Sequence, residues 1–188
     1  MSTAIPLELP PPVQQIPSDI LWEEINGQIM EKYVGAKEIE LANDLMFAIS
    51  VVAKPGKLGR TLVEMVFDWI ALNGHKRRPD VAFVSFDRWA QDTDLPEGTD
   101  WKVVPNLAVE VVSLSNSFGD VIDKKNEYFG VGVDQVWIVV PSAKEIHVYE
   151  SATDMRVVSG SHTLTAEALL PGFELSLTEL FGTSAANS

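Results

Sequence analysis

The sequence predicts an α/β fold in which a sheet of mixed strand direction is flanked by helices and extended by additional antiparallel strands. The first observation is a strand–helix–strand pattern over residues 105–140, which implies two parallel strands joined by a right-handed crossover. The second is an amphipathic stretch at 36–53, which predicts a further helix. The third is a series of short β-branched runs after residue 134, each followed by a turn.

Length and composition predict a single folded unit. The chain has 188 residues, of which 46% are hydrophobic and 22% are charged, as in ordinary globular domains. We expect a proline-rich, extended arm at 1–19, one domain at 20–182 and a frayed tail at 183–188.

Three absences from the sequence predict a cytoplasmic protein. The chain contains no cysteine, which excludes a disulfide scaffold, thiolate zinc ligands and a cysteine nucleophile. Its apolar runs are far shorter than a bilayer requires. The first residues lack the basic and apolar regions of a secretory signal. We therefore expect no membrane partner.

The first half of the chain predicts a hairpin, a helix and two strands. Asn26-Gly27 lies between two short, partly apolar runs, and both residues tolerate the positive φ of a tight turn. The helix at 36–53 ends at a Lys-Pro-Gly sequence. Residues 59–70 alternate between two faces as a single strand does, and 78–86 form the next strand.

The second half begins with an acidic, polar stretch at 87–104 that predicts a loop or a short helix. Trp89 and Trp101 flank it and are candidates to stack on bases or on a partner. The elements that follow are a strand at 105–113, a helix at 118–129, strands at 134–141 and 144–151, and final strands that we expect to close the sheet.

The charge balance argues against a protein that simply coats nucleic acid. The net charge is −13, whereas proteins that bind phosphate backbones are usually basic. The charge is unevenly spread, because 54–125 holds most of the basic residues and is nearly neutral. Its basic stretches, Lys54 to Arg60 and Lys76 to Arg78, either guide a phosphate backbone or are solvated loops.

Two carboxylates occupy positions that predict chemistry. Glu110 sits in the middle of an apolar strand, where an uncompensated carboxylate is costly to bury. Asp80 begins the neighbouring apolar run. If both converge at one end of a sheet, they form the oxygen-rich site that Mg²⁺ prefers. The alternatives are a turn-forming Asp after proline and an exposed Glu on an edge strand.

The helix that follows Glu110 supplies a third group. Asp120, Lys124 and Tyr128 are spaced four residues apart and share one helix face. A crossover helix packs against the sheet of its own strand, so Lys124 can reach over the sheet towards Glu110, above the short side chain of Val112. The alternative is a solvated Asp–Lys ion pair that stabilises the fold by roughly a few tenths of a kcal/mol.

Three segments together resemble the Uma-type putative restriction endonuclease family of the PD-(D/E)-x-K nuclease superfamily. They are RRPDVAFVS at 77–85, VPNLAVEVVS at 104–113 and DVIDKKNEYFGVGVDQVWIVVP at 120–141. The resemblance extends from about residue 20, with INGQIMEK, to PGFELSLTELF near 181. It implies a restriction endonuclease-like mixed sheet.

The resemblance also implies residue roles. Asp80 and Glu110 match the acidic metal ligands, and the implied cofactor is Mg²⁺ or Mn²⁺. The superfamily lysine usually lies two residues after the second acid, where this chain has Val112. Lys124 matches the lysine that the Uma-type group takes from the following helix. Glu38 matches an additional acid, for which Glu40 and Glu64 are competitors.

The expected function is metal-dependent hydrolysis of phosphodiester bonds by an endonuclease. The expected partner is a nucleic acid, DNA before RNA, and a homodimer formed through the proline-rich arm or the terminal strands is a further expectation. An alternative is a nuclease-like fold that no longer cuts and serves binding or assembly, which the acidic composition and Val112 favour. A third is hydrolysis of another phosphate ester.

Overall fold

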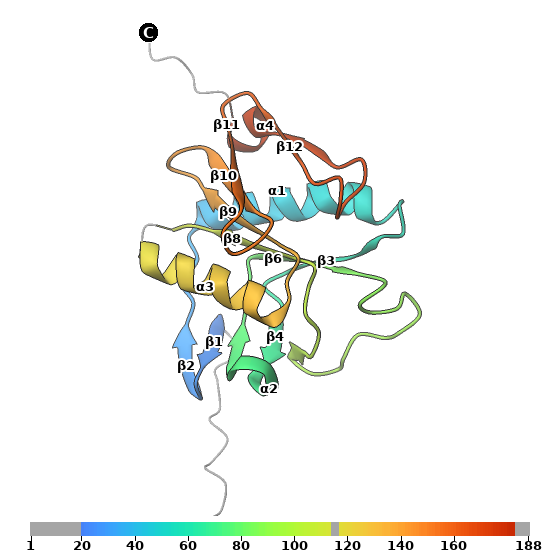
Figure 1. Cartoon of the computed structure of the whole chain (residues 1–188), viewed down its shortest axis with the longest axis vertical. Helices are drawn as coiled ribbons and strands as arrows, with labels where there is room; N and C mark the ends of the chain where they lie inside the picture. The colour runs from blue at the N-terminus through green and yellow to red at the C-terminus, as the bar shows by residue number, and fades with distance from the viewer. Residues whose placement is uncertain (1–19, 114–116, 183–188) are drawn as a thin grey trace, which may run out of the picture.

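The computed structural model describes residues 20–113 and 117–182. The arm predicted at 1–19 and the tail predicted at 183–188 lie outside the described residues, so those two predictions stay untested. Within the described parts, the two larger sheets and the two longer helices are arranged in layers, with one sheet between α1 and α3 (Figure 1).

A six-stranded mixed sheet forms the centre of the fold, as predicted. The strand order is β11-β10-β9-β8-β6-β3, and every neighbouring pair is antiparallel except β8 and β9. That parallel pair is joined by α3 (Phe118–Val131), which is the predicted crossover. The strands are β3 (Gly59–Val63), β6 (Val81–Ser85), β8 (Leu107–Val111), β9 (Gln135–Val140), β10 (Glu145–Tyr149) and β11 (Met155–Ser159).

A second, five-stranded sheet was not expected. Its order is β2-β1-β5-β4-β7, and β1 and β2 form the hairpin predicted at Asn26-Gly27, whose φ values are 51° and 79°. The single strand expected at 59–70 is in fact two strands, because Glu64 takes a positive φ of 51° between them. The strands are β1 (Trp22–Ile25), β2 (Gln28–Glu31), β4 (Val66–Trp69), β5 (His75–Arg77) and β7 (Asp100–Trp101).

The larger core lies between α1 and the six-stranded sheet (Figure 1). The helix spans Ala36–Ala53, as predicted, and buries Leu41, Leu45 and Ile49 at helical spacing. In the strands, alternate residues such as Val109 and Trp137 face this helix. The C-terminal elements cover the rest of that face.

Those C-terminal elements correct one expectation. Strand β11 extends the central sheet, but β12 (Thr163–Thr165) and β13 (Glu174–Ser176) pair only with each other and form a separate hairpin-like sheet. The short helix α4 (Leu177–Phe181) follows and packs against α1. In the described part of the chain, no helix combines the length and apolar character needed to cross a bilayer.

The opposite face of the central sheet packs against α3 and aromatic side chains of the second sheet. Phe67 stacks between Trp69 and Trp101, and Trp69 contacts the ring of Tyr128 edge-on. Trp101 is 1% exposed, so the expectation that it stacks on bases or a partner is wrong. The sequence predicts a loop or a short helix at this position, whereas Trp101 lies in β7, which pairs with β4 beside the short helix α2 (Ile70–Asn73).

Two glycines differ in the space around them, so replacement by alanine should change the free energy of unfolding in opposite directions at the two positions. At Gly59 an added Cβ would lie 2.2 Å from the carbonyl oxygen of Val84 and 2.8 Å from the Phe83 ring. Gly130 lies on α3 with no atom within 4 Å of an added Cβ. We expect Gly59→Ala to lower the free energy of unfolding by about 1–3 kcal/mol. Gly130→Ala should raise it by up to about 1 kcal/mol. Urea unfolding measures both, and equal shifts would contradict the packing described.

Candidate active site

A cavity of about 470 Å³ opens between the β1–β2 hairpin, the N-terminal half of α3 and the end of β8. All four residues that the sequence singled out line it: Asp80, Glu110, Lys124 and Glu38. They come from four separate segments of the chain: α1, the start of β6, β8 and α3. The structure therefore brings them to one cavity, although it does not bring them all into contact with one another.

Asp80 is fixed beside Glu110 by strand register. It lies one residue before β6, whose Val81 pairs with Val109 of the antiparallel strand β8. Its side chain is almost fully buried. The Oδ2 atom accepts a hydrogen bond from the backbone N–H of Val111 at 2.5 Å, and Oδ1 pairs with the ammonium of Lys32 at 2.7 Å.

Glu110 points to the α3 side of the central sheet, because alternate residues of β8 face opposite sides. The Tyr128 hydroxyl donates a hydrogen bond to its Oε1, and the Lys124 ammonium lies 3.3 Å from its Oε2. Burial raises the pKa of Glu110, and Lys124 opposes that effect while Asp80 adds to it. A nearby cation therefore stabilises the ionised carboxylate.

Lys124 reaches the cavity because α3 crosses the sheet above Glu110. Ser117 caps the helix and accepts a hydrogen bond from the N–H of Asp120, which fixes where the helix begins. The Lys124 ammonium lies between two carboxylates, 3.3 Å from Glu110 and 3.0 Å from Glu23. Burial lowers the pKa of Lys124, but these two carboxylates outweigh it and the net shift is upward.

Sequence reasoning missed Glu23 of β1. Its carboxylate is buried and pairs with Arg77 at 2.9 Å as well as with Lys124, and it accepts a hydrogen bond from the N–H of Arg78 at 3.1 Å. Burial raises its pKa, yet Lys124 and Arg77 outweigh burial and hold it below the usual value. The only signal was a Glu-Glu pair in a strand, which also fits a solvated face.

Sequence reasoning also missed Lys32, which follows β2. Its ammonium lies 2.7 Å from Asp80 Oδ1, 2.8 Å from the carbonyl oxygen of Arg78 and 3.1 Å from Glu64 Oε2. Its side chain is mostly buried. Burial lowers the pKa of Lys32, but Asp80 and the neighbouring carboxylates reverse this and raise it. Lys32 ends the INGQIMEK segment of the family resemblance, but no residue pattern marked it as part of the site.

The three competing acids have different places. Glu38 is half-buried in the first turn of α1 and lines the cavity. Glu40 faces a different cavity, near α4. The carboxylate of Glu64 forms an ion pair with the ammonium of Lys32, which also forms an ion pair with Asp80. Glu64 therefore contacts the site through Lys32.

The basic stretch Lys76 to Arg78 is not a free surface. Lys76 pairs with Asp100 at 2.6 Å, on the outer side of β5. Arg77 binds Glu127 through two nitrogens at 2.7 Å each. Arg78 donates to backbone carbonyl oxygens. The charges of this stretch are therefore already paired or hydrogen-bonded within the protein, and its role as a guide for phosphate stays a prediction.

The donor set suits Mg²⁺ in its chemistry, although the described residues form no complete ligand cluster. Among the described residues, no group of three or more Asp, Glu, His or Cys side chains is arranged to hold a metal ion. Asp80 and Glu110 supply carboxylate oxygens beside the cavity, although Lys32 and Lys124 already pair with them. Mg²⁺ is often held by one or two carboxylates with water completing its shell.

The buried carboxyl group of Glu64 predicts a pH dependence of stability. Burial raises the pKa of Glu64 from 4.5 to about 7, with Lys32 opposing and Asp80 adding to the shift. Between these values the folded state binds more protons than the unfolded chain, so stability falls as pH rises. We expect the metal-free protein to lose roughly 1–3 kcal/mol across this window. Glu64→Gln should reduce that loss in urea unfolding, and an identical loss in the variant would contradict the assignment.

Comparison with known proteins identifies the family. Residues 7–178 match the Uma2 family, described as "Putative restriction endonuclease". No curated protein matches the chain. The fold is similar to a crystal structure of a putative nuclease belonging to DUF820 from Anabaena variabilis, with a TM-score of 0.74 and 19% identity over 85% of this chain and 89% of that one. The family match covers most of the sequence, and the chain belongs to the Uma2 putative restriction endonuclease family.

Proposed function

We propose that the protein is a divalent-metal-dependent endonuclease that hydrolyses phosphodiester bonds in DNA. The observation that carries the proposal is the convergence of Asp80, Glu110 and Lys124 on one cavity, from the start of β6, from β8 and from α3. The family match supports a nuclease activity. Metal dependence is proposed from the chemistry of the site, and DNA is proposed as the substrate from the family's description as a putative restriction endonuclease.

Asp80 and Glu110 are the residues that would hold the metal. Both are buried carboxylates that face the cavity, and register places them side by side on adjacent strands. Bound Mg²⁺ would polarise a phosphoryl oxygen and acidify a water molecule. Backbone geometry preorganises Asp80, because the N–H of Val111 fixes its second oxygen at 2.5 Å.

Lys124 is the group we assign to the negative charge that develops on the phosphate. Its ammonium is held by two carboxylates, Glu110 and Glu23, so its position is set before substrate arrives. Its raised pKa keeps it cationic at neutral pH. The hydroxyl of Tyr128 orients Glu110 by donating a hydrogen bond to Oε1. Glu23 is a positioning residue for Lys124.

The second candidate is a nuclease-like protein that binds without cutting. Protein donors already occupy Asp80 and Glu110, namely Lys32 and the Val111 N–H on Asp80, and Lys124 and Tyr128 on Glu110. With these donors in place, the charges of the two carboxylates are compensated without a metal ion. The two candidates differ in whether added metal produces cleavage.

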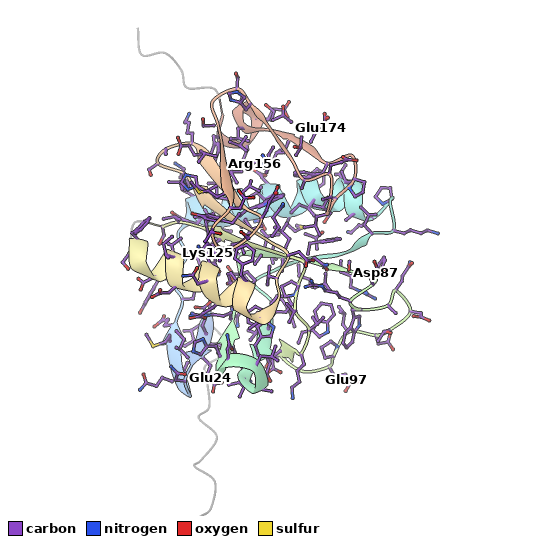
Figure 2. The ribbon with its side chains drawn as sticks, in the orientation of Figure 1. Glu24, Asp87, Glu97, Lys125, Arg156 and Glu174 are labelled. Atoms are coloured by element: carbon purple, nitrogen blue, oxygen red, sulfur yellow. The ribbon has the colours of Figure 1, made fainter. Side chains whose placement is uncertain are left out.

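Plasmid nicking tests the proposal. We expect the protein to nick supercoiled DNA in the presence of Mg²⁺ or Mn²⁺, and Asp80→Asn to abolish nicking. The matched control is Asp87→Asn, because Asp87 is an exposed aspartate just past the other end of β6 and away from the cavity (Figure 2). It should nick at the rate of the unchanged protein.

Several outcomes contradict this assignment. Equal nicking by the Asp80→Asn variant would remove Asp80 from the site. No metal-dependent nicking by any of the three proteins would favour the binding candidate. Cleavage of single-stranded RNA or of a simple phosphate diester, with none of DNA, would retain the chemistry and change the substrate.

Two adjacent lysines on α3 give a sharper test of Lys124. The ammonium of Lys125 donates to the carbonyl oxygen of Ala152 and lies over the ring of Tyr149, away from the cavity (Figure 2). We expect Lys124→Met to lower the nicking rate by about 100-fold or more, because it removes a preorganised charge. Lys125→Met should lower thermal stability and leave the nicking rate unchanged. Comparable losses of rate in both variants would show that Lys124 has no specific role.

A further inference from the structure

The ammonium of Lys32 is surrounded by oxygen atoms of the kind that bind cations. Oxygen atoms of three different residues surround its ammonium: Asp80 Oδ1 at 2.7 Å, the carbonyl of Arg78 at 2.8 Å, and both carboxylate oxygens of Glu64 at 3.1 and 3.2 Å. The backbone N–H of Lys32 donates to the carbonyl oxygen of Leu21 at 2.8 Å, which fixes where the side chain begins. These oxygens are the kind of ligand that a hard divalent cation takes.

Lys32 also limits what else can bind Asp80. One oxygen of Asp80 accepts the Val111 N–H, and the other faces the ammonium of Lys32. The donor of the first bond is a backbone N–H held in β8, so its position is set by the sheet. A metal ion that binds Asp80 through Oδ1 therefore takes a lone pair beside the Lys32 ammonium, whose positive charge opposes it.

We propose that the ammonium of Lys32 and a divalent cation are alternative occupants of Asp80, and that the cation binds by displacing the lysine. This inference rests on the proposed metal site. The displaced ammonium keeps its contacts with Glu64 and with the Arg78 carbonyl, so it gives up only the contact with Asp80. Lys32 thereby sets the affinity of the site for metal and keeps the carboxylates neutralised when no metal is bound.

Lys124 is a weaker competitor for the same ion. Its ammonium lies closer to Glu23, at 3.0 Å, than to Glu110, at 3.3 Å. Lys32 is closest to Asp80 itself, at 2.7 Å. The geometry therefore assigns the competition for Asp80 to Lys32 and leaves Lys124 in contact with its carboxylates.

Calorimetric titration of the full chain with MnCl₂ tests the inference. We expect Lys32→Met to bind Mn²⁺ about tenfold more tightly or better than the unchanged protein, because the competing charge is gone while the apolar stem is retained. The control is Lys102→Met, which removes the same charge from a side chain that is 82% exposed and outside the cavity. Its affinity should stay within about twofold.

Thermal unfolding gives a second readout. In EDTA, Lys32→Met should melt below the unchanged protein, because it leaves Asp80 and Glu64 buried without their cation. Mn²⁺ should then raise its melting temperature more than that of the unchanged protein. If Lys32→Met does not fold, Lys32→Gln retains a hydrogen-bond donor and should shift Mn²⁺ affinity in the same direction.

The outcomes separate this inference from the proposed function. Equal or weaker Mn²⁺ binding by the Lys32 variants, in a protein that nicks DNA with Mn²⁺, overturns the competition and leaves the nuclease intact. Absence of Mn²⁺ binding in every protein overturns both. Tighter binding in the Lys32 variants without any nicking supports the competition and rejects the endonuclease.

Discussion

The compensation of buried carboxylates by buried cations is the constraint on which this structure depends. Glu23, Asp80 and Glu110 are each less than a tenth exposed, and an unpaired carboxylate at such positions would be too costly to keep ionised. Lys32, Lys124 and Arg77 supply the opposite charges from a hairpin, a helix and a strand. The ion pairs therefore fix how the two sheets and α3 meet, as well as what chemistry the cavity offers.

Part of the site could be predicted from the sequence, because some of its residues break a local pattern. Glu110 interrupts an apolar strand, and Lys124 lies on a crossover helix whose packing direction is known in advance. Glu23, Lys32 and Glu64 break no pattern, since charged residues are ordinary in short, partly exposed strands and turns. Their roles arise only when the second sheet folds against the first, which no single-segment argument could anticipate.

The fold, like the site, could be predicted from the sequence only in part. Long periodic segments such as the helix at Ala36–Ala53 and the strand at Leu107–Val111 were predictable, because burial on one or both faces leaves a strong pattern. The break at Glu64 was not, because alternation continues in the sequence across a residue whose backbone turns with positive φ. One turn therefore converted a single expected strand into members of two sheets, and placed Trp101 in a core rather than on a surface.

The β1–β2 hairpin joins the site to the periphery of the molecule. It is a short antiparallel pair at the edge of the five-stranded sheet, yet it carries Glu23 and leads directly into Lys32. Short edge hairpins are among the first parts of a protein to open locally. A transient opening of the hairpin would withdraw Glu23 and Lys32 from the cavity together. The cavity would then change its shape but keep its net charge, and Asp80 and Glu110 would both be exposed to solvent.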